Sequence, residues 1–258
     1  MPNETAKSPD TSPEYRIARR SWVTRPRLRK LLAALEDSDE PYRTLYLKPD
    51  SQNSDPDAGP EVSEVLREVP KSETGLAIFM GDGSAIAIAP PFPIGEDAFA
   101  KGVDGSPLTE ILDRKVTVGI VLLRLGRYAV GVVQGEKVLA SKSGSRHVKN
   151  RHKQGGSSQR RFERSRERLV REIFDKACEV TRTVFTPYEK RMDYIMLGGE
   201  KTTLRGLEER CAYLTKTDIE VMARRLAVER PGKVALGTIH REVWKSHVYA
   251  LERVPNAR

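Results

Sequence analysis

The chain has 258 residues, enough for one large domain or two small ones. It contains 45 Lys or Arg against 36 Asp or Glu, a net charge of +9, and its hydrophobic content is 38 %. No segment approaches the roughly 18 consecutive apolar residues that cross a bilayer, and the first residues lack the apolar stretch of a signal peptide. We therefore expect a cytoplasmic protein that does not associate with membranes.

Two cysteines, Cys178 and Cys211, stand in unrelated sequence contexts. Their number and spacing argue against a disulfide framework or a zinc site, and they are typical of a protein from a reducing cytosol.

The first part of the chain predicts a disordered tail at residues 1–20 and a small α/β module at residues 21–110. The tail contains three prolines and no apolar periodicity, so it buries too little surface to offset the entropy of ordering. In the module, leucine spacing indicates a helix, and Gly81-Asp82-Gly83 between two apolar runs indicates a hairpin. The expected elements are a helix at 26–35, a strand at 43–47, an irregular segment at 49–60, a helix at 62–69, and hairpin strands at 75–80 and 84–89.

The second part predicts a larger α/β domain at residues 111–254. A β-branched run and turn signals at Gly126 and Gly135 indicate an antiparallel meander of three strands. The expected elements are strands at 116–123, 128–133 and 137–142, a long amphipathic helix at about 158–184, a strand at 194–197, a helix at 204–214, a strand at 226–228, a helix at 233–246 and a strand at 247–251. A meander followed by alternating helices and strands predicts a mixed sheet with helices on its faces.

Most of the net positive charge lies in one window. Residues 142–171 contain eleven Lys or Arg and two Glu, a local net charge of +9, so the rest of the chain is balanced. Residues 142–161 contain seven basic residues and no acidic one. A focused positive patch on a neutral body is typical of a protein that binds polyanions. The alternative is a solvated charged face or a membrane-surface patch, although ordinary surfaces mix both signs.

A glycine-rich basic loop within this window joins the meander to the long helix. Gly155 and Gly156 allow the backbone to approach a ligand closely, and the start of the following helix offers N–H groups and a positive dipole to anions. Gln159 does not titrate, so it cannot be a general base, but its amide can orient a water or donate to a developing charge. These residue types indicate nucleic-acid binding before they indicate catalysis. The expected RNA-binding residues are Lys142, Arg146, Lys149, Arg151, His152, Lys153, Arg160, Arg161 and Arg164.

Other candidate sites are weaker. The segment from Gly198 to Thr202 lacks the glycine–lysine spacing of a phosphate-binding P-loop. His147 and His152 have no carboxylate or thiol nearby in sequence, and Ser157 does not lie in a G-x-S-x-G motif. We expect neither a metal nor a cofactor.

The arrangement resembles the central, catalytic domain of the archaeo-eukaryotic class-I translation termination factors, over about residues 116–253. The shared features are the meander, then His152, Gly155-Gly156, Arg161-Phe162, Arg164 and Arg166, and then a strand that ends in Gly198-Gly199. Those factors have glutamine directly after the two glycines, where this chain has Ser157, and Gln159 follows two positions later. This variant is similar to the Vms-like (VLRF) branch, which releases nascent chains during ribosome quality control. The resemblance implies an RNase H-like α/β fold for the catalytic domain.

The resemblance also implies a function: a peptidyl-tRNA hydrolase that frees nascent chains from stalled ribosomal complexes. The catalytic segment would be Gly155, Gly156, Ser157, Ser158 and Gln159, with Gln159 placing a water at the ester on the CCA end of the tRNA. Because the chain has no counterpart of the stop-codon-reading motifs, we expect codon-independent action. The implied partners are the large ribosomal subunit and peptidyl-tRNA, bound by a monomer. Two alternatives stay open, a non-catalytic factor that binds the ribosome or tRNA and a nuclease that cuts the tRNA 3′ end.

Overall fold

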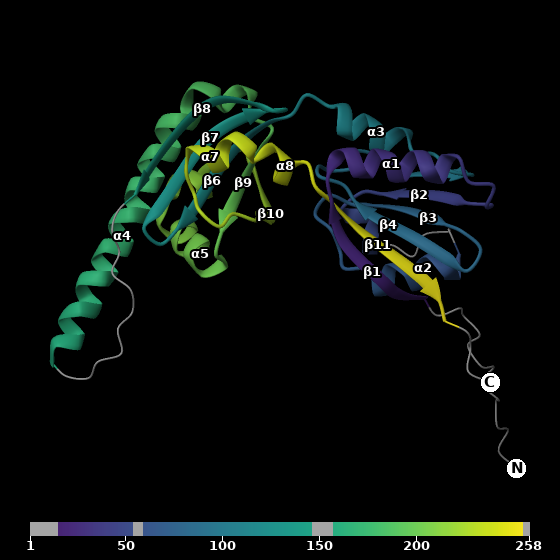
Figure 1. The fold of residues 1–258 in the computed structure, drawn as a ribbon, viewed down its shortest axis with the longest axis horizontal. Helices are drawn as coiled ribbons and strands as arrows, with labels where there is room; N and C mark the ends of the chain where they lie inside the picture. Colours follow the sequence, from purple (N-terminus) through teal and green to yellow (C-terminus); the bar gives the residue numbers. More distant parts are fainter. Residues whose placement is uncertain (1–14, 54–58, 146–156, 255–258) are drawn as a thin grey trace, which may run out of the picture. The chain divides into compact units, whose positions relative to one another are not determined.

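The computed structural model describes residues 15–53, 59–145 and 157–254, and in it the chain builds two β-sheets, each in a unit of its own (Figure 1). Unit 1 consists of Met1–Asp113 and Lys245–Arg258, and unit 2 is Arg114–Trp244. Unit 2 is therefore an insertion in the chain of unit 1. The sequence prediction divided the chain at residue 110 and assigned the last strand to the second domain. In the structure this strand belongs to unit 1.

Unit 1 is built on a six-stranded sheet in the order β1-β11-β4-β3-β2-β5, in which every neighbouring pair is antiparallel. Its elements are β1 (Tyr15–Val23), α1 (Arg25–Glu36), β2 (Arg43–Leu47), the 3-10 helix η1 (Asp50–Asn53), α2 (Pro60–Glu68), β3 (Leu76–Met80), β4 (Ser84–Ala89), β5 (Ala98–Lys101), α3 (Ser106–Asp113) and β11 (Ser246–Arg253).

The helices of unit 1 pack on the two faces of this sheet (Figure 1). Helix α1 buries Leu28, Leu32 and Leu35, which are spaced at helical intervals, and it lies with α3 on one face. Helix α2 packs on the other face, where Val62 and Val65 join a cluster with side chains of β1, β2, β3, β4 and β11. The sequence predicted α1, α2 and the β3–β4 hairpin at nearly the observed positions.

Besides the 3-10 helix η1, three elements of unit 1 were not predicted from the sequence. Residues 15–20, expected in the tail, form most of β1, whose alternation is interrupted by a bulge between Ile17 and Arg19. Strand β5 is short and largely exposed, so it has no apolar run to mark it. Helix α3 begins at Ser106, immediately before a proline, and buries Leu108, Ile111 and Leu112.

Unit 2 contains a five-stranded mixed sheet in the order β10-β9-β6-β7-β8. The meander β6–β7–β8 is antiparallel, while β9 runs parallel to both β6 and β10. Its elements are β6 (Thr117–Arg124), β7 (Arg127–Gln134), β8 (Lys137–Ser145), α4 (Ser157–Phe185), the 3-10 helix η2 (Thr186–Arg191), β9 (Tyr194–Gly199), α5 (Lys201–Arg210), α6 (Ala212–Lys216), β10 (Glu220–Leu226), α7 (Lys233–Thr238) and α8 (His240–Val243). The expected mixed α/β class is confirmed.

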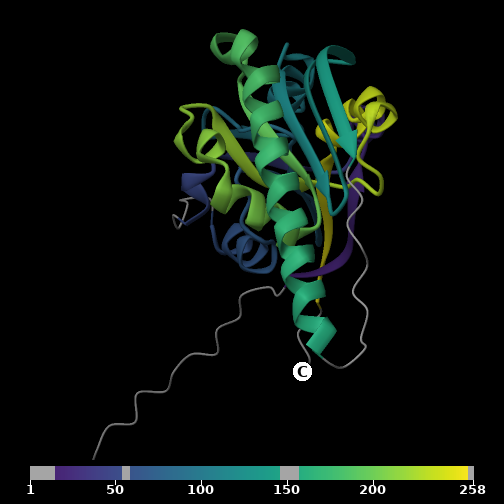
Figure 2. The same cartoon turned by 90° about the vertical axis from the view of Figure 1, so that its left-hand side faces the viewer.

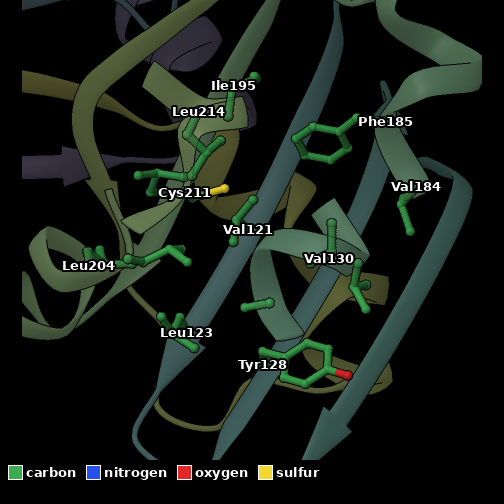
Figure 3. Packing of buried hydrophobic residues seen from close by; sticks show 14 of the residues in the cluster. Val121, Leu123, Tyr128, Val130, Val184, Phe185, Ile195, Leu204, Cys211 and Leu214 are labelled. Carbon is green, nitrogen blue, oxygen red and sulfur yellow. The ribbon is translucent and has the colours of Figure 1, made fainter. Parts of the chain in front are cut away.

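The main core of unit 2 lies between one face of the sheet and the helices α4, α5 and α6 (Figure 3). Val121, Leu123 and Val130 from the sheet pack against Val184 and Phe185 of α4 and Leu204 of α5. Helix α7 contacts β7 and β8, with Leu236 next to Gly131 of β7. The long α4 runs along the sheet, and its first turns extend past the edge of the strands (Figure 2).

The helices and strands of unit 2 differ from the predicted ones at a few places, mostly because a predicted helix is interrupted. The helix expected at 204–214 is two helices, because the backbone leaves the helical conformation at Cys211. The helix expected at 233–246 is likewise divided into α7 and α8, with Ile239 between them. The strand expected at 226–228 is β10, which ends at Leu226, and its alternating polar residues hid it from an apolar pattern.

Candidate nucleic-acid interface

Helix α4 follows the basic loop directly and positions the start of the candidate site. Its C-terminal half is fixed by apolar packing, because Ile173, Ala177, Val180 and Val184 repeat at helical spacing and are buried in the unit 2 core. In its N-terminal half, residues 157–169, none of the side chains that the structure describes is buried. The helix thus leaves the core at about Val170 and continues toward the loop as an exposed element.

A disulfide bond between Cys178 and Cys211 joins α4 to the end of α5. The expectation of two unrelated thiols was wrong. The two residues are 33 positions apart in sequence, and η2, β9 and α5 between them return the chain to α4, bringing the two Cα atoms to 5.3 Å. A spacing of this kind contains no local signal, so only the tertiary fold reveals the pair.

An ion pair at the same place adds a polar link between the two helices. Arg210 at the end of α5 donates to Asp175 of α4 through Nε and a terminal nitrogen, each at 3.0 Å from a carboxylate oxygen. Such a bidentate pair restrains orientation as well as distance. The helices also approach closely at Gly206, where an added Cβ would lie 2.7 Å from the Phe174 ring. These contacts all fall in the half of α4 that faces the core.

The exposed half of α4 presents a line of arginines. Arg161, Arg164, Arg168 and Arg171 are all exposed, and their spacing of three, four and three residues places them on one face of the helix. Arg168 forms an ion pair with Glu172 at 3.7 Å. We call these four residues the arginine stripe. Arg168 and Arg171 were not in the expected set, although the same spacing in the sequence identifies them.

Lys142, another expected RNA-binding residue, is exposed on strand β8 and lies in a different electrostatic environment. Lys176 of α4 donates to both carboxylate oxygens of Glu179 at 2.7 Å. This hydrogen bond lowers the pKa of the Glu179 carboxyl, and the positive charge of Lys142 contributes in the same direction. Lys142 therefore lies near a carboxylate as well as solvent.

The remaining expected residues divide between the helix and the loop. Ser157, Ser158, Gln159 and Arg160 form the first turn of α4. Gly155, Gly156, Arg146, Lys149, Arg151, His152 and Lys153 lie outside the described residues. The structure thus places Gln159 at the third position of a 29-residue helix, directly after the loop that contains the two glycines.

Two features of the described residues bear on other kinds of site. Within residues 15–53, 59–145 and 157–254, no group of three or more His, Cys, Asp or Glu side chains is arranged to hold a metal ion. Across the same residues, no helix is both long enough and apolar enough to cross a membrane.

Comparison with known proteins gives similarity to release factors. Peptide chain release factor subunit 1 of Methanopyrus kandleri is 29 % identical over 227 residues, which cover 72 % of this chain and 55 % of that protein. The corresponding protein of Archaeoglobus fulgidus is 32 % identical over 97 residues, covering 38 % of this chain and 24 % of that protein. The chain spans about half the length of the first relative and less of the second.

Two solved structures are similar to this chain over most of its length, but their TM-scores are low. An archaeal translation termination factor covers 85 % of this chain and 73 % of its own, with 17 % identity and a TM-score of 0.34. The Vms1 mitochondrial localization core covers 70 % of this chain and 77 % of its own, with 14 % identity and a TM-score of 0.39.

The family assignment rests on a model that matches the sequence itself. The model of the Actinobacteria/chloroflexi VLRF1 release factor matches residues 116–249, which is more than half of the chain and includes the meander, the loop, α4 and the arginine stripe. The chain belongs to the Actinobacteria/chloroflexi VLRF1 release factor family.

Proposed function

We propose that this protein is a peptidyl-tRNA hydrolase that releases nascent chains from stalled ribosomal complexes in the cytoplasm without reading a codon. The observation that supports this most is the position of Gln159 on α4. Gln159 lies fourteen residues before Ile173, which is buried in the core, and α4 is continuous between them. At 1.5 Å per residue, the helix carries Gln159 about 21 Å beyond that buried side chain.

This reach suits a substrate enclosed by RNA. The ester of peptidyl-tRNA lies in a narrow centre of the large subunit, so a hydrolase must insert a slender element rather than a whole domain. An exposed single helix that begins with a glycine-rich loop has this shape, and glycines let the backbone pass close to RNA walls. We propose that the segment from Gly155 to Gln159 enters this centre and reaches the CCA end.

Hydrolysis breaks the bond between the peptide carbonyl carbon and the 3′-oxygen of the terminal adenosine. The oxygen of a water forms the new bond to that carbon, and a proton passes to the departing 3′-oxygen, which leaves the peptide with a free carboxylate. Gln159 cannot take the proton because its amide does not titrate. Its proposed role is to hold the water against the carbonyl, so that positioning supplies much of the acceleration.

The start of α4 offers a second source of stabilisation. The first four N–H groups of a helix have no partner within the helix, and the helix dipole places partial positive charge there. In α4 these groups belong to Ser157, Ser158, Gln159 and Arg160. Donors at this place are suited to the negative charge that develops on the carbonyl oxygen during attack.

The arginine stripe supplies the binding part of the proposal. Its four guanidinium groups lie on an exposed face, and arginine forms bidentate hydrogen bonds with phosphate. Contacts to phosphate position a protein on RNA without reading sequence, which agrees with codon-independent action. The loop residues Arg146, Lys149, Arg151, His152 and Lys153 are proposed to extend this contact toward the tRNA.

The test is peptide release from large subunits carrying peptidyl-tRNA, with the Gln159→Ala variant. Loss of one preorganised donor typically lowers a rate by about 10²- to 10³-fold, and we expect a decrease of this size with binding to subunits unchanged. Gln154→Ala is the matched control, since it removes a glutamine from the loop that precedes α4, and we expect near-normal release.

Release by Gln159→Ala at the normal rate would overturn the catalytic role and leave a factor that only binds the ribosome or tRNA. Sequencing the 3′ end of the tRNA after the reaction separates the nuclease alternative. An intact CCA end is expected from ester hydrolysis, whereas a shortened end would mean that the RNA itself is cut.

A further inference from the structure

A second basic segment lies in unit 1, in a part of the chain that the proposed hydrolase does not use. Residues 15–30 contain seven Lys or Arg and no acidic residue. They form β1 and the start of α1. Arg25 and Arg29 of α1 pair with Asp113, whereas Arg16, Arg19 and Arg20 of β1 are exposed to solvent. Among the described strands, β1 lies at the edge of the sheet and pairs with β11.

A stacked aromatic cluster lies at the end of β1, across from β11. Trp22 is opposite His247 in the strand register, and their rings are nearly parallel, with an interplanar angle of 11° and centroids 4.4 Å apart. The His247 ring in turn contacts Tyr249, with centroids 4.3 Å apart and a 2.8 Å hydrogen bond between Tyr249 Oη and His247 Nδ1. Trp22 stacks on His247 and is still 49 % exposed.

Arg20 belongs to the same surface as this cluster. It is opposite Tyr249 in the register, two residues from Trp22, so both side chains leave β1 on the same face of the sheet. The indole is therefore held in place by His247 beside a guanidinium group. Holding an aromatic ring in its binding orientation lowers the entropy lost when a ligand stacks on it.

Charged groups act on the tyrosines near both ends of β1. Burial raises the pKa of Tyr15, and the carboxylates of Glu61 and Asp82 act on it together with Arg253 and Arg43. Burial also raises the pKa of Tyr249, and the positive charge of Arg20 acts in the opposite direction. Arg20 thus acts electrostatically on the aromatic cluster at this end of the strand.

We propose that Trp22 and Arg20 form a binding site for single-stranded RNA, in which a base stacks on the exposed part of the indole and the Arg20 guanidinium contacts a backbone phosphate. Sites of this kind combine a positive surface with an aromatic ring that every base can stack on. Bases inside a duplex are already stacked on each other, so the site selects unpaired RNA. This proposal goes beyond the hydrolase function and does not depend on Gln159.

Tryptophan fluorescence gives a local test, because the chain has two tryptophans and the other, Trp244, is buried. In the full chain with Trp244→Phe, a short oligoadenylate should quench Trp22 in a saturable manner. Trp22→Ala should weaken binding of the labelled oligonucleotide by about five- to hundredfold, the loss expected for one base–aromatic stack. Trp22→Phe should restore most of it, which separates stacking from a folding defect.

Two controls decide the outcome. Phe99→Ala removes an aromatic side chain that is 56 % exposed on β5, the opposite edge strand of the same sheet, and it should leave binding unchanged. An adenylate–uridylate duplex should quench Trp22 much less than the single strand. Absence of quenching, or equal affinity of the Trp22→Ala variant, would overturn the site. Gln159→Ala should leave the quenching intact, so failure of one proposal is distinguishable from failure of the other.

Discussion

The two halves of α4 belong to one continuous helix but are held in different ways. Residues 170–185 pack on the sheet, bond through Cys178 to Cys211, and pair through Asp175 with Arg210. Residues 157–169 have no buried side chain among those described, and they present exposed arginines instead. The difference agrees with two tasks: one half fixes the direction of the helix, and the other half, in the proposed function, presents Gln159 to the RNA. Substitutions in the core half should therefore mainly lower the stability of the protein. Substitutions in the exposed half should mainly weaken RNA binding.

The largest expected effect on stability comes from the core half. Phe185 at the end of α4 has no exposed surface, and its ring lies against Gly119 of β6. Phe185→Ala removes this packing and leaves a cavity, so we expect the free energy of unfolding to decrease by about 3 to 5 kcal/mol. Denaturant unfolding of the full chain, followed by far-ultraviolet circular dichroism, measures the change.

Ser165→Ala is the control in the other half of the same helix. Ser165 is exposed, and surface substitutions away from special features usually change stability by no more than about 0.5 kcal/mol. Equal destabilisation by the two variants would mean that residues 157–169 are packed as firmly as the core half, and the division of α4 into two parts would then be wrong.

Local patterns in the sequence predicted those elements whose signals are local. The meander, the β3–β4 hairpin, α1 and α4 all have periodic apolar residues or glycine turns, and each was expected within a few residues of its observed position. Strand β1 was missed because its bulge breaks the alternation and its exposed arginines resemble a tail. The place of β11 was also missed, because pairing with β4 and β1 depends on strands more than 150 residues earlier in the chain.

The candidate site shows the same limit. The glycines, the glutamine and the arginine spacing are adjacent in sequence, so the loop and the exposed half of α4 could be identified from the chain alone. The residues that hold the other half could not, because Cys211 and Arg210 approach α4 only after the chain has passed through β9 and α5. The Trp22–His247 stack likewise joins the two ends of the chain.

The disulfide bond is the second way to test the core half. Closing a loop of 33 residues restricts the unfolded chain, and the chain-entropy model gives about 3 to 4 kcal/mol of stabilisation for this length. Reductant should lower the free energy of unfolding by about this amount in the normal protein and should have no effect on Cys178→Ser. The thiol content gives an independent measure, because a denatured, unreduced chain should contain no free thiol. Two free thiols per chain would contradict the bond.

The smallest expected effect comes from the exposed half, and it concerns binding rather than stability. Arg161 and Arg164 are exposed, and each exposed ion pair contributes about 0.2 to 1 kcal/mol, so Arg161→Ala with Arg164→Ala should weaken binding to large subunits by about two- to thirtyfold. Because each lost phosphate contact also reduces the salt dependence, the slope of log affinity against log salt should decrease by about 2. Arg182→Ala is the matched control, an exposed arginine in the core half of α4, and it should leave both quantities unchanged. If Arg182 mattered as much as the stripe, RNA would lie along the whole helix, and α4 could not be divided into one half that holds and another that binds.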